Sequence, residues 1–109
     1  MLDEKYINII SDIIEHYGSE KQVLQAVEEM SELTKELIKN INRNKENEAE
    51  ITLEIADVII MLMQIMIIYD IDPNKVLGGI EYKLLRQKER IENESKRNWI
   101  MIGNRSKID

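Results

Sequence analysis

The sequence predicts an all-α protein, a helical bundle of about four helices per chain. The composition is 43% hydrophobic and 33% charged, with one proline and four glycines in 109 residues, which suits helices and argues against a turn-rich β fold. Apolar residues recur at spacings of three and four. The length predicts one domain, 1–109, with a core at about 20–92 and a tail at 93–109. Because a domain of this size buries only a moderate core, a second copy of the chain would help to cover its apolar residues.

Two amphipathic helices are predicted first, over residues 2–17 and about 20–41. Gly18 is expected to end the first helix, and Ser19 with Gln22 forms an S-x-x-Q capping box that would start the second. The apolar stripe of the first helix consists of Leu2, Tyr6, Ile9, Ile10, Ile13 and Tyr17.

A polar segment, 40–48, reads as a loop, and a central helix follows at about 47–69. Between Asp57 and Asp70 its only polar side chain is Gln64. A helix that is apolar on every side is expected to be buried. Its run of apolar residues is shorter than the roughly 20 residues that cross a bilayer, so we predict protein core and no membrane partner.

The fourth predicted helix begins with Asp72 as N-cap and Pro73 in the first turn. Gly78 and Gly79 inside it predict either the close approach of a neighbour or ligand, or a kink. Beyond Glu92 the periodicity is lost, so we expect the tail to fray. The apolar cluster at 99–102 is expected to dock onto the domain or onto a partner chain.

Charge and cysteine content exclude several classes of function. The formal net charge is −6 and the estimated pI is 4.9, which disfavours a nucleic-acid polymer as partner because such binding needs many Lys and Arg. With no cysteine, the chain has no disulfide, thiolate metal site or cysteine nucleophile. The first ten residues lack the basic segment of a secretory signal, which predicts a cytoplasmic location.

Two pairs of carboxylates have i, i+3 spacing: Glu29 with Glu32, and Glu54 with Asp57. An ionised carboxylate in an apolar helix needs hydrogen bonds, a counter-charge or a bound cation. Two antiparallel helices could bring all four side chains to one point. Carboxylates without His or Cys favour Mg²⁺, with Mn²⁺ as a substitute, over zinc. The alternatives are a solvated face for the first pair and neutralisation by Lys or Arg for the second.

The segments EEMSEL at 28–33 and EIADVIIML at 54–62 resemble the E-x-x-E and E-x-x-D signature of the all-α nucleoside triphosphate pyrophosphohydrolases, the MazG-like superfamily. The resemblance covers roughly residues 20–92. It implies Mg²⁺-dependent hydrolysis of NTPs or dNTPs to the monophosphate and pyrophosphate. It also implies a homodimer or homotetramer in which the chains oligomerise into a four-helix-bundle core. It further implies that the two carboxylate pairs are metal ligands. Because a carboxylate near a metal-bound water can take its proton, our hypothesis is that Glu29 or Glu32 acts as general base. Met61 stands where some members carry an aromatic residue or Asn, so the preferred base stays open.

Three cations on the fourth helix, Lys83, Arg86 and Arg90, follow i, i+3, i+7 spacing and share one face. They are expected to bind the phosphate oxygens of the substrate, and an ordinary charged surface is the alternative. Two other functions also stay open: a relative acting on phosphoribosyl-ATP, and a non-catalytic helical interaction module.

Overall fold

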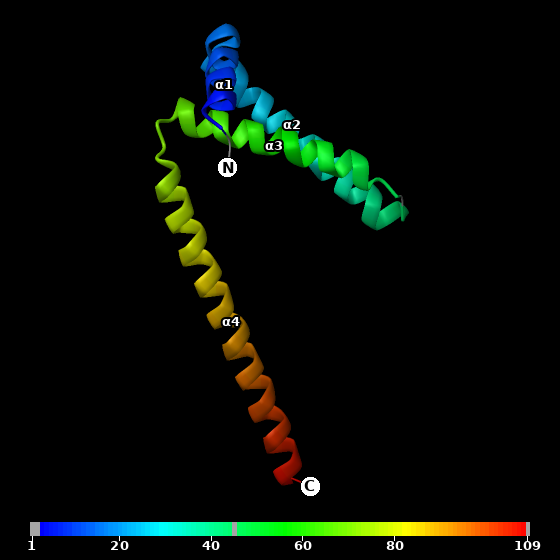
Figure 1. The fold of residues 1–109 in the computed structure, drawn as a ribbon. Helices are drawn as coiled ribbons and strands as arrows, with labels where there is room; N and C mark the ends of the chain where they lie inside the picture. Colours follow the sequence, from blue (N-terminus) through cyan, green and yellow to red (C-terminus); the bar gives the residue numbers. More distant parts are fainter. Residues whose placement is uncertain (1–2, 45, 109) are drawn as a thin grey trace. The chain divides into compact units, whose positions relative to one another are not determined.

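The computed structural model describes residues 3–44 and 46–108, with side chains as far as Gly103. Leu2, assigned above to the first apolar stripe, lies outside the described residues. Within them the chain forms four helices and no strand, which confirms the all-α prediction (Figure 1). The helices are α1 (Glu4–Tyr17), α2 (Ser19–Arg43), α3 (Glu48–Ile68) and α4 (Pro73–Ile108).

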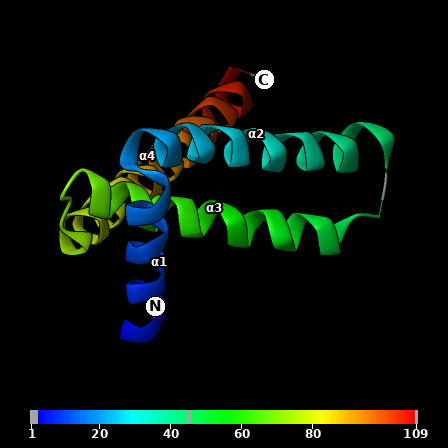
Figure 2. The ribbon, with the colours of Figure 1, turned by 90° about the horizontal axis from the view of Figure 1, so that it is seen from above.

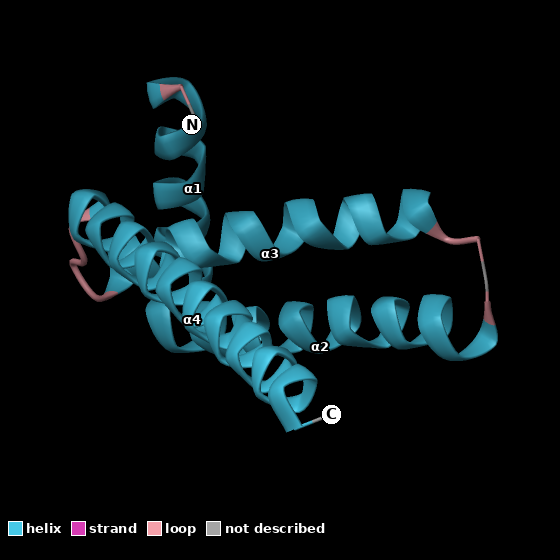
Figure 3. Cartoon of the chain, turned by 90° about the horizontal axis from the view of Figure 1, so that it is seen from below, coloured by secondary structure: helices cyan, strands magenta, loops and turns pink. Residues whose placement is uncertain are grey.

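The chain divides into two compact units, Met1–Ile71 and Asp72–Asp109, and each is described by itself. In the first unit, which we call the helical hairpin unit, α2 and α3 lie side by side and run in opposite directions (Figure 2). The helix α1 crosses them at the end where α2 begins and α3 finishes, as Figures 2 and 3 both show. The second unit consists of α4.

Gly18 separates α1 from α2, as predicted. Its φ of +90° lies in a region that favours glycine, and its N–H donates to the carbonyl of Ile14 at 2.8 Å. The predicted capping box is wrong. Ser19 is the first residue of α2, and no side chain caps the helix. Because the connection is one residue long, Gly18 occupies the N-cap position, and Gln22 is buried instead.

The turn between α2 and α3 is fixed by Asn47, which is 1% exposed. Its Nδ2 donates to the Glu36 carbonyl at 2.9 Å and to Glu36 Oε2 at 2.7 Å, and its Oδ1 accepts from Asn40 Nδ2 at 3.0 Å. The helix α2 continues to Arg43, so the connection is shorter than the predicted loop 40–48. These bonds tie the start of α3 to α2 and hold the hairpin in an antiparallel arrangement.

The core of the helical hairpin unit is small. Its buried hydrophobic residues among those described are Ile10, Ala26 and Met61, one from each helix. The expectation that α3 is buried on every side is wrong for a single chain, since two helices cannot surround it. Several large apolar side chains of α3 are exposed: Leu53, Ile55, Ile60, Leu62 and Ile67.

By length and composition alone, α3 could cross a membrane, with a mean hydropathy of 2.2 over its most apolar 18 residues. The core helix of a soluble protein meets the same criterion. Glu54 and Asp57 lie within α3, and charged groups at membrane depth are costly.

The helix α4 begins where predicted: Asp72 Oδ1 accepts the N–H of Asn74 at 2.9 Å, and Pro73 is the first helical residue. It does not end near Glu92 but continues to Ile108, because residues 93–108 contain no proline and only Gly103 interrupts them. A Cβ added at Gly78 or Gly79 would meet nothing within 4 Å, so no described neighbour approaches either glycine closely.

Candidate metal centre

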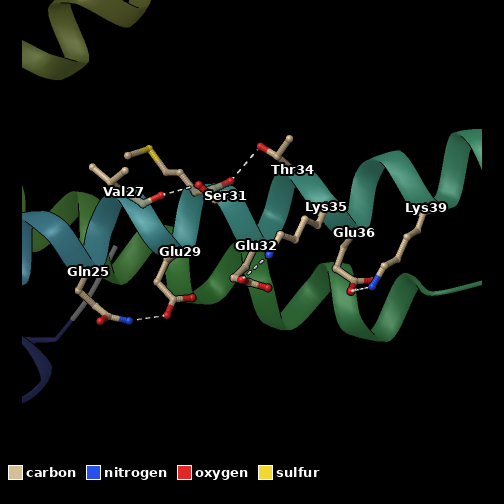
Figure 4. A network of polar contacts seen from close by, with 10 residues as sticks. Gln25, Val27, Glu29, Ser31, Glu32, Thr34, Lys35, Glu36 and Lys39 are labelled. Atoms are coloured by element: carbon tan, nitrogen blue, oxygen red, sulfur yellow. Dashed lines mark hydrogen bonds and ion pairs between the residues drawn. The ribbon is translucent and has the colours of Figure 1, made fainter.

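One side of α2 carries a row of acidic side chains. In Figure 4, Glu29, Glu32 and Glu36 extend from the same side of the helix, toward α3. Val27 and Ser31 extend from the opposite side. The spacing of three and four residues places the acids in this row, and the antiparallel hairpin brings α3 alongside it.

Three of the four predicted ligands come together. Glu29 of α2 and Glu54 and Asp57 of α3 each offer one carboxylate oxygen, and these oxygens lie within 4.8 Å of one another. Oxygens on opposite sides of a Mg²⁺ ion are about 4.2 Å apart, from the ideal coordination distance of about 2.1 Å. Small side-chain rotations would close the difference, so the donor set fits a hard divalent cation.

Glu54 is the central member of this group. It is half-buried, and its Oε2 is buried without a hydrogen-bond partner. Burial raises the pKa of Glu54 above its usual 4.5, and the charges of Asp57, Glu29, Glu32 and Glu36 raise the pKa further. A carboxylate with a raised pKa, a buried unpaired oxygen and four acidic neighbours would gain greatly from a bound cation.

Glu32, the fourth predicted ligand, is not part of the three-carboxylate group. Its Oε1 lies 3.2 Å from Lys35 Nζ, in an ion pair whose glutamate side chain is 43% exposed. The charge of Glu32 still contributes to the raised pKa of Glu54, so the two carboxylates lie near each other. Glu32 therefore borders the group while paired with a lysine of its own helix.

Sequence reasoning missed one residue that positions this site. Gln25 Nε2 donates to Glu29 Oε1 at 2.9 Å, which orients the carboxylate one turn away (Figure 4). The i, i+4 spacing of Gln25 and Glu29 was the available signal. A donor on one oxygen leaves the lone pairs of the other free for a cation.

The three predicted phosphate-binding cations, Lys83, Arg86 and Arg90, lie on α4 in the second unit and are exposed. Each follows the last by one turn, so they share one face of that helix. The structure thus places them on a common stripe, separate in sequence from the carboxylates. Met61, which stands where some members of the resembled family carry an aromatic residue or Asn, is buried in the core.

No protein-family model, curated protein or solved structure gives a significant match to this chain.

Proposed function

We propose that this protein is a Mg²⁺-dependent nucleotide pyrophosphohydrolase of the MazG-like kind, which converts NTPs or dNTPs to the monophosphate and pyrophosphate. One observation carries the proposal: carboxylate oxygens of Glu29, Glu54 and Asp57 converge within 4.8 Å from two antiparallel helices. The buried, unpaired Oε2 of Glu54 supports it, since no Lys or Arg neutralises that oxygen in the described chain. The type of reaction is inferred from the sequence resemblance to the MazG-like enzymes.

The carboxylates would hold Mg²⁺, or Mn²⁺, which neutralises triphosphate charge and lowers the pKa of a bound water. Water oxygen attacks the α-phosphorus, the bond from that phosphorus to the bridging oxygen breaks, and pyrophosphate leaves. Glu29 or Glu32 would accept the proton of the water. If Glu32 acts as base or as fourth ligand, it must first release Lys35, its present partner.

The phosphate oxygens also need cations from the protein, and Lys83, Arg86 and Arg90 remain our candidates. Their common stripe on α4 supports this role. Assembly of a homodimer or homotetramer around a four-helix-bundle core is part of the same proposal. It is supported by the exposed apolar residues of α2 and α3, which a second hairpin would cover.

An activity panel tests the proposal. We expect Mg²⁺-dependent release of pyrophosphate from at least one nucleoside triphosphate, with the monophosphate as the other product. Canonical and modified NTPs and dNTPs should be compared side by side with phosphoribosyl-ATP. Glu54→Gln and Asp57→Asn should abolish turnover while keeping the helical circular dichroism signal. Thr52→Ala, a change at an exposed residue of α3 outside the acidic group, is the matched control.

A second function, a non-catalytic helical interaction module, is favoured by the many exposed apolar side chains. The two proposals differ in metal binding. Calorimetric titration with Mg²⁺ or Mn²⁺ should give a saturable signal for the enzyme, which Glu54→Gln removes. Absence of metal binding and of hydrolysis across the panel would exclude the enzyme and leave the module.

A further inference from the structure

Toward its C-terminal end, α4 carries a cluster of exposed apolar side chains. We call residues 95–103 the C-terminal arm. The arm contains Trp99, 76% exposed, followed by Ile100, Met101 and Ile102, all exposed. At about 100° per residue, four consecutive apolar side chains surround the helix rather than forming one stripe. Such a ring is suited to insertion into a protein groove, whereas an amphipathic helix lying on a membrane keeps one polar face.

An apolar pocket in the helical hairpin unit could receive such an anchor. It has a volume of about 230 Å³ and is lined by α1 and one residue of α3: Tyr6, Ile9, Ile10, Ile13 and Ile60. Pockets for small-molecule ligands usually measure about 300–1,000 Å³. The size and the wholly apolar lining therefore favour one or two inserted side chains over a cofactor.

Charge is complementary between the two surfaces. Residues 1–71 carry 15 acidic and six basic residues, a net of −9, whereas residues 72–109 carry six acidic and nine basic residues, a net of +3. The arm itself contains Lys96 and Arg97 and no acid. The exposed acids of α1, Glu4, Asp12 and Glu15, lie on the side of that helix away from the pocket, so the complementarity is between the two units as wholes. Attraction between the opposite net charges would favour the encounter.

Covalent geometry prevents the arm from filling the pocket of its own chain. Trp99 lies 26 residues into α4, about 39 Å along a continuous helix. The N–H of Ile71 donates to the Met66 carbonyl at 2.8 Å, and Met66 is only about 9 Å along α3 from Ile60. Two residues later α4 begins, so its start lies within about 20 Å of Ile60. Whatever direction α4 takes, Trp99 stays far from its own Ile60.

We infer that the C-terminal arm docks on a second copy of this chain, with Trp99 inserted into the apolar pocket that Tyr6, Ile9, Ile10, Ile13 and Ile60 line. Lys96 and Arg97 then approach a unit whose net charge is −9. This contact is independent of the proposed hydrolysis, since it uses none of the carboxylates of the metal centre.

Trp99 is the only tryptophan, so its fluorescence reports directly on docking. In the full chain, the emission maximum should shift to shorter wavelength as the concentration rises, in step with an increase in mass by analytical ultracentrifugation. Ile9→Lys, a change at an exposed residue that the helix tolerates, should abolish the shift. Trp99→Ala should weaken self-association about 30-fold or more, as expected for a buried aromatic anchor worth at least about 2 kcal/mol.

Mixing two variants tests whether docking occurs between chains. Trp99→Ala keeps the pocket and lacks the anchor, whereas Ile9→Lys keeps the anchor and lacks an apolar pocket. Mixed together, they should restore the short-wavelength emission that neither shows alone. Ser11→Lys, an exposed change on α1 that does not line the pocket, is the matched control for Ile9→Lys and should leave the emission unchanged.

Three results would overturn the inference. One is a Trp99 emission that does not depend on concentration, and another is a mixture that behaves as the sum of its parts. The third is a shift that appears only when phosphatidylserine vesicles are added, which would assign the arm to a membrane surface. If Ile9→Lys lowers the helical circular dichroism signal, Lys96→Glu with Arg97→Glu replaces it. That double variant should weaken docking without touching the pocket.

Discussion

Glu54 occupies an unfavourable position in the folded chain. Its Oε2 is buried and unpaired, and the charges of four other carboxylates raise its pKa. A carboxyl group with a raised pKa in the folded state binds its proton more tightly there than in the unfolded chain. The protonated form therefore stabilises the fold below the ordinary pKa of 4.5, and this stabilisation is lost as pH rises through the raised pKa.

We therefore predict that Glu54→Gln raises the melting temperature of the protein in EDTA at neutral pH. The wild-type melting temperature should fall as pH rises from 4.5 through the raised pKa of Glu54, and the variant should lack this part of the fall. Thermal melts followed by circular dichroism across this pH range measure both effects. If the melting temperatures of the two proteins depended on pH in the same way, Glu54 would not be an unfavourably placed carboxylate.

Addition of Mg²⁺ should make the wild type more stable than Glu54→Gln. A cation that binds the folded state alone stabilises it by about 2.7 kcal/mol when present at a hundredfold excess over its dissociation constant. Saturating Mg²⁺ should raise the melting temperature of the wild type and leave that of Glu54→Gln unchanged. A melting temperature of the wild type that does not respond to Mg²⁺ or Mn²⁺ would argue against a metal centre.

The two glutamates of α2 should differ in their contribution to metal binding. Glu29 belongs to the converging group, whereas Glu32 is paired with Lys35. We predict that Glu29→Gln weakens Mg²⁺ binding at least about tenfold, or 1.4 kcal/mol, and that Glu32→Gln has a smaller effect. Calorimetric titration compares the two, and a larger loss for Glu32→Gln would mean that Glu32 exchanges Lys35 for the cation.

The residues of the site were largely predictable because their spacing follows from helix geometry. Glu54 and Asp57 stood out as charges in an apolar helix, and i, i+3 spacing placed each pair on one side. The ion pair of Glu32 with Lys35 was not predicted, although i, i+3 pairs are common on helices. The choice between a neighbouring lysine and a shared cation depends on distances between helices, which a single sequence does not contain.

Among the elements, the α2–α3 turn determines which carboxylates meet. Asn47 is buried and makes three hydrogen bonds, two to Glu36 and one to Asn40. Asn47→Ala leaves the Asn40 amide without this acceptor and removes both donors to Glu36. We expect the free energy of unfolding to fall by about 2–4 kcal/mol, from roughly 1 kcal/mol or more for each bond.

Urea unfolding of Asn47→Ala measures that loss, with Asn42→Ala as control. Asn42 is exposed and lies in the last turn of α2, so its replacement should change stability by no more than about 0.5 kcal/mol. If the two variants are equally stable, the hydrogen bonds of Asn47 do not determine the hairpin.

The limits of the helices were predicted best where one residue decides the backbone conformation. Gly18 ends α1 because glycine readily adopts a positive φ. Asp72 and Pro73 begin α4 because Asp72 accepts a backbone N–H and the fixed φ of Pro73 suits the first helical turn. The prediction was wrong where it relied on a polar composition, as in the loop 40–48 and the tail beyond Glu92. Polar residues such as Asn and Lys are tolerated in helices, so loss of apolar periodicity alone did not mark an end.

At the scale of the whole molecule, the main feature is the apolar surface that a single chain leaves exposed. The helix α3 has the hydropathy of a core helix, yet in a single chain only Met61 and Gln64 of this helix are buried. A free surface of this kind is typical of a chain that associates with others. The sequence indicated association only through its length, since a lone domain of this size buries a moderate core.

If folding and association are coupled in a dimer, stability must depend on concentration. We predict that each tenfold dilution lowers the apparent free energy of unfolding by about 1.4 kcal/mol.

Leu62, an exposed apolar residue of α3, should lie in the surface that a second copy covers. Leu62→Lys should therefore reduce the mean mass in solution at concentrations where the wild type associates, and should lower its melting temperature. Ser11→Lys adds the same charge to the exposed surface of α1 and should leave both values unchanged. A wild-type mass of one chain at every concentration, with a melting temperature independent of dilution, would mean that α3 is not covered by a second copy.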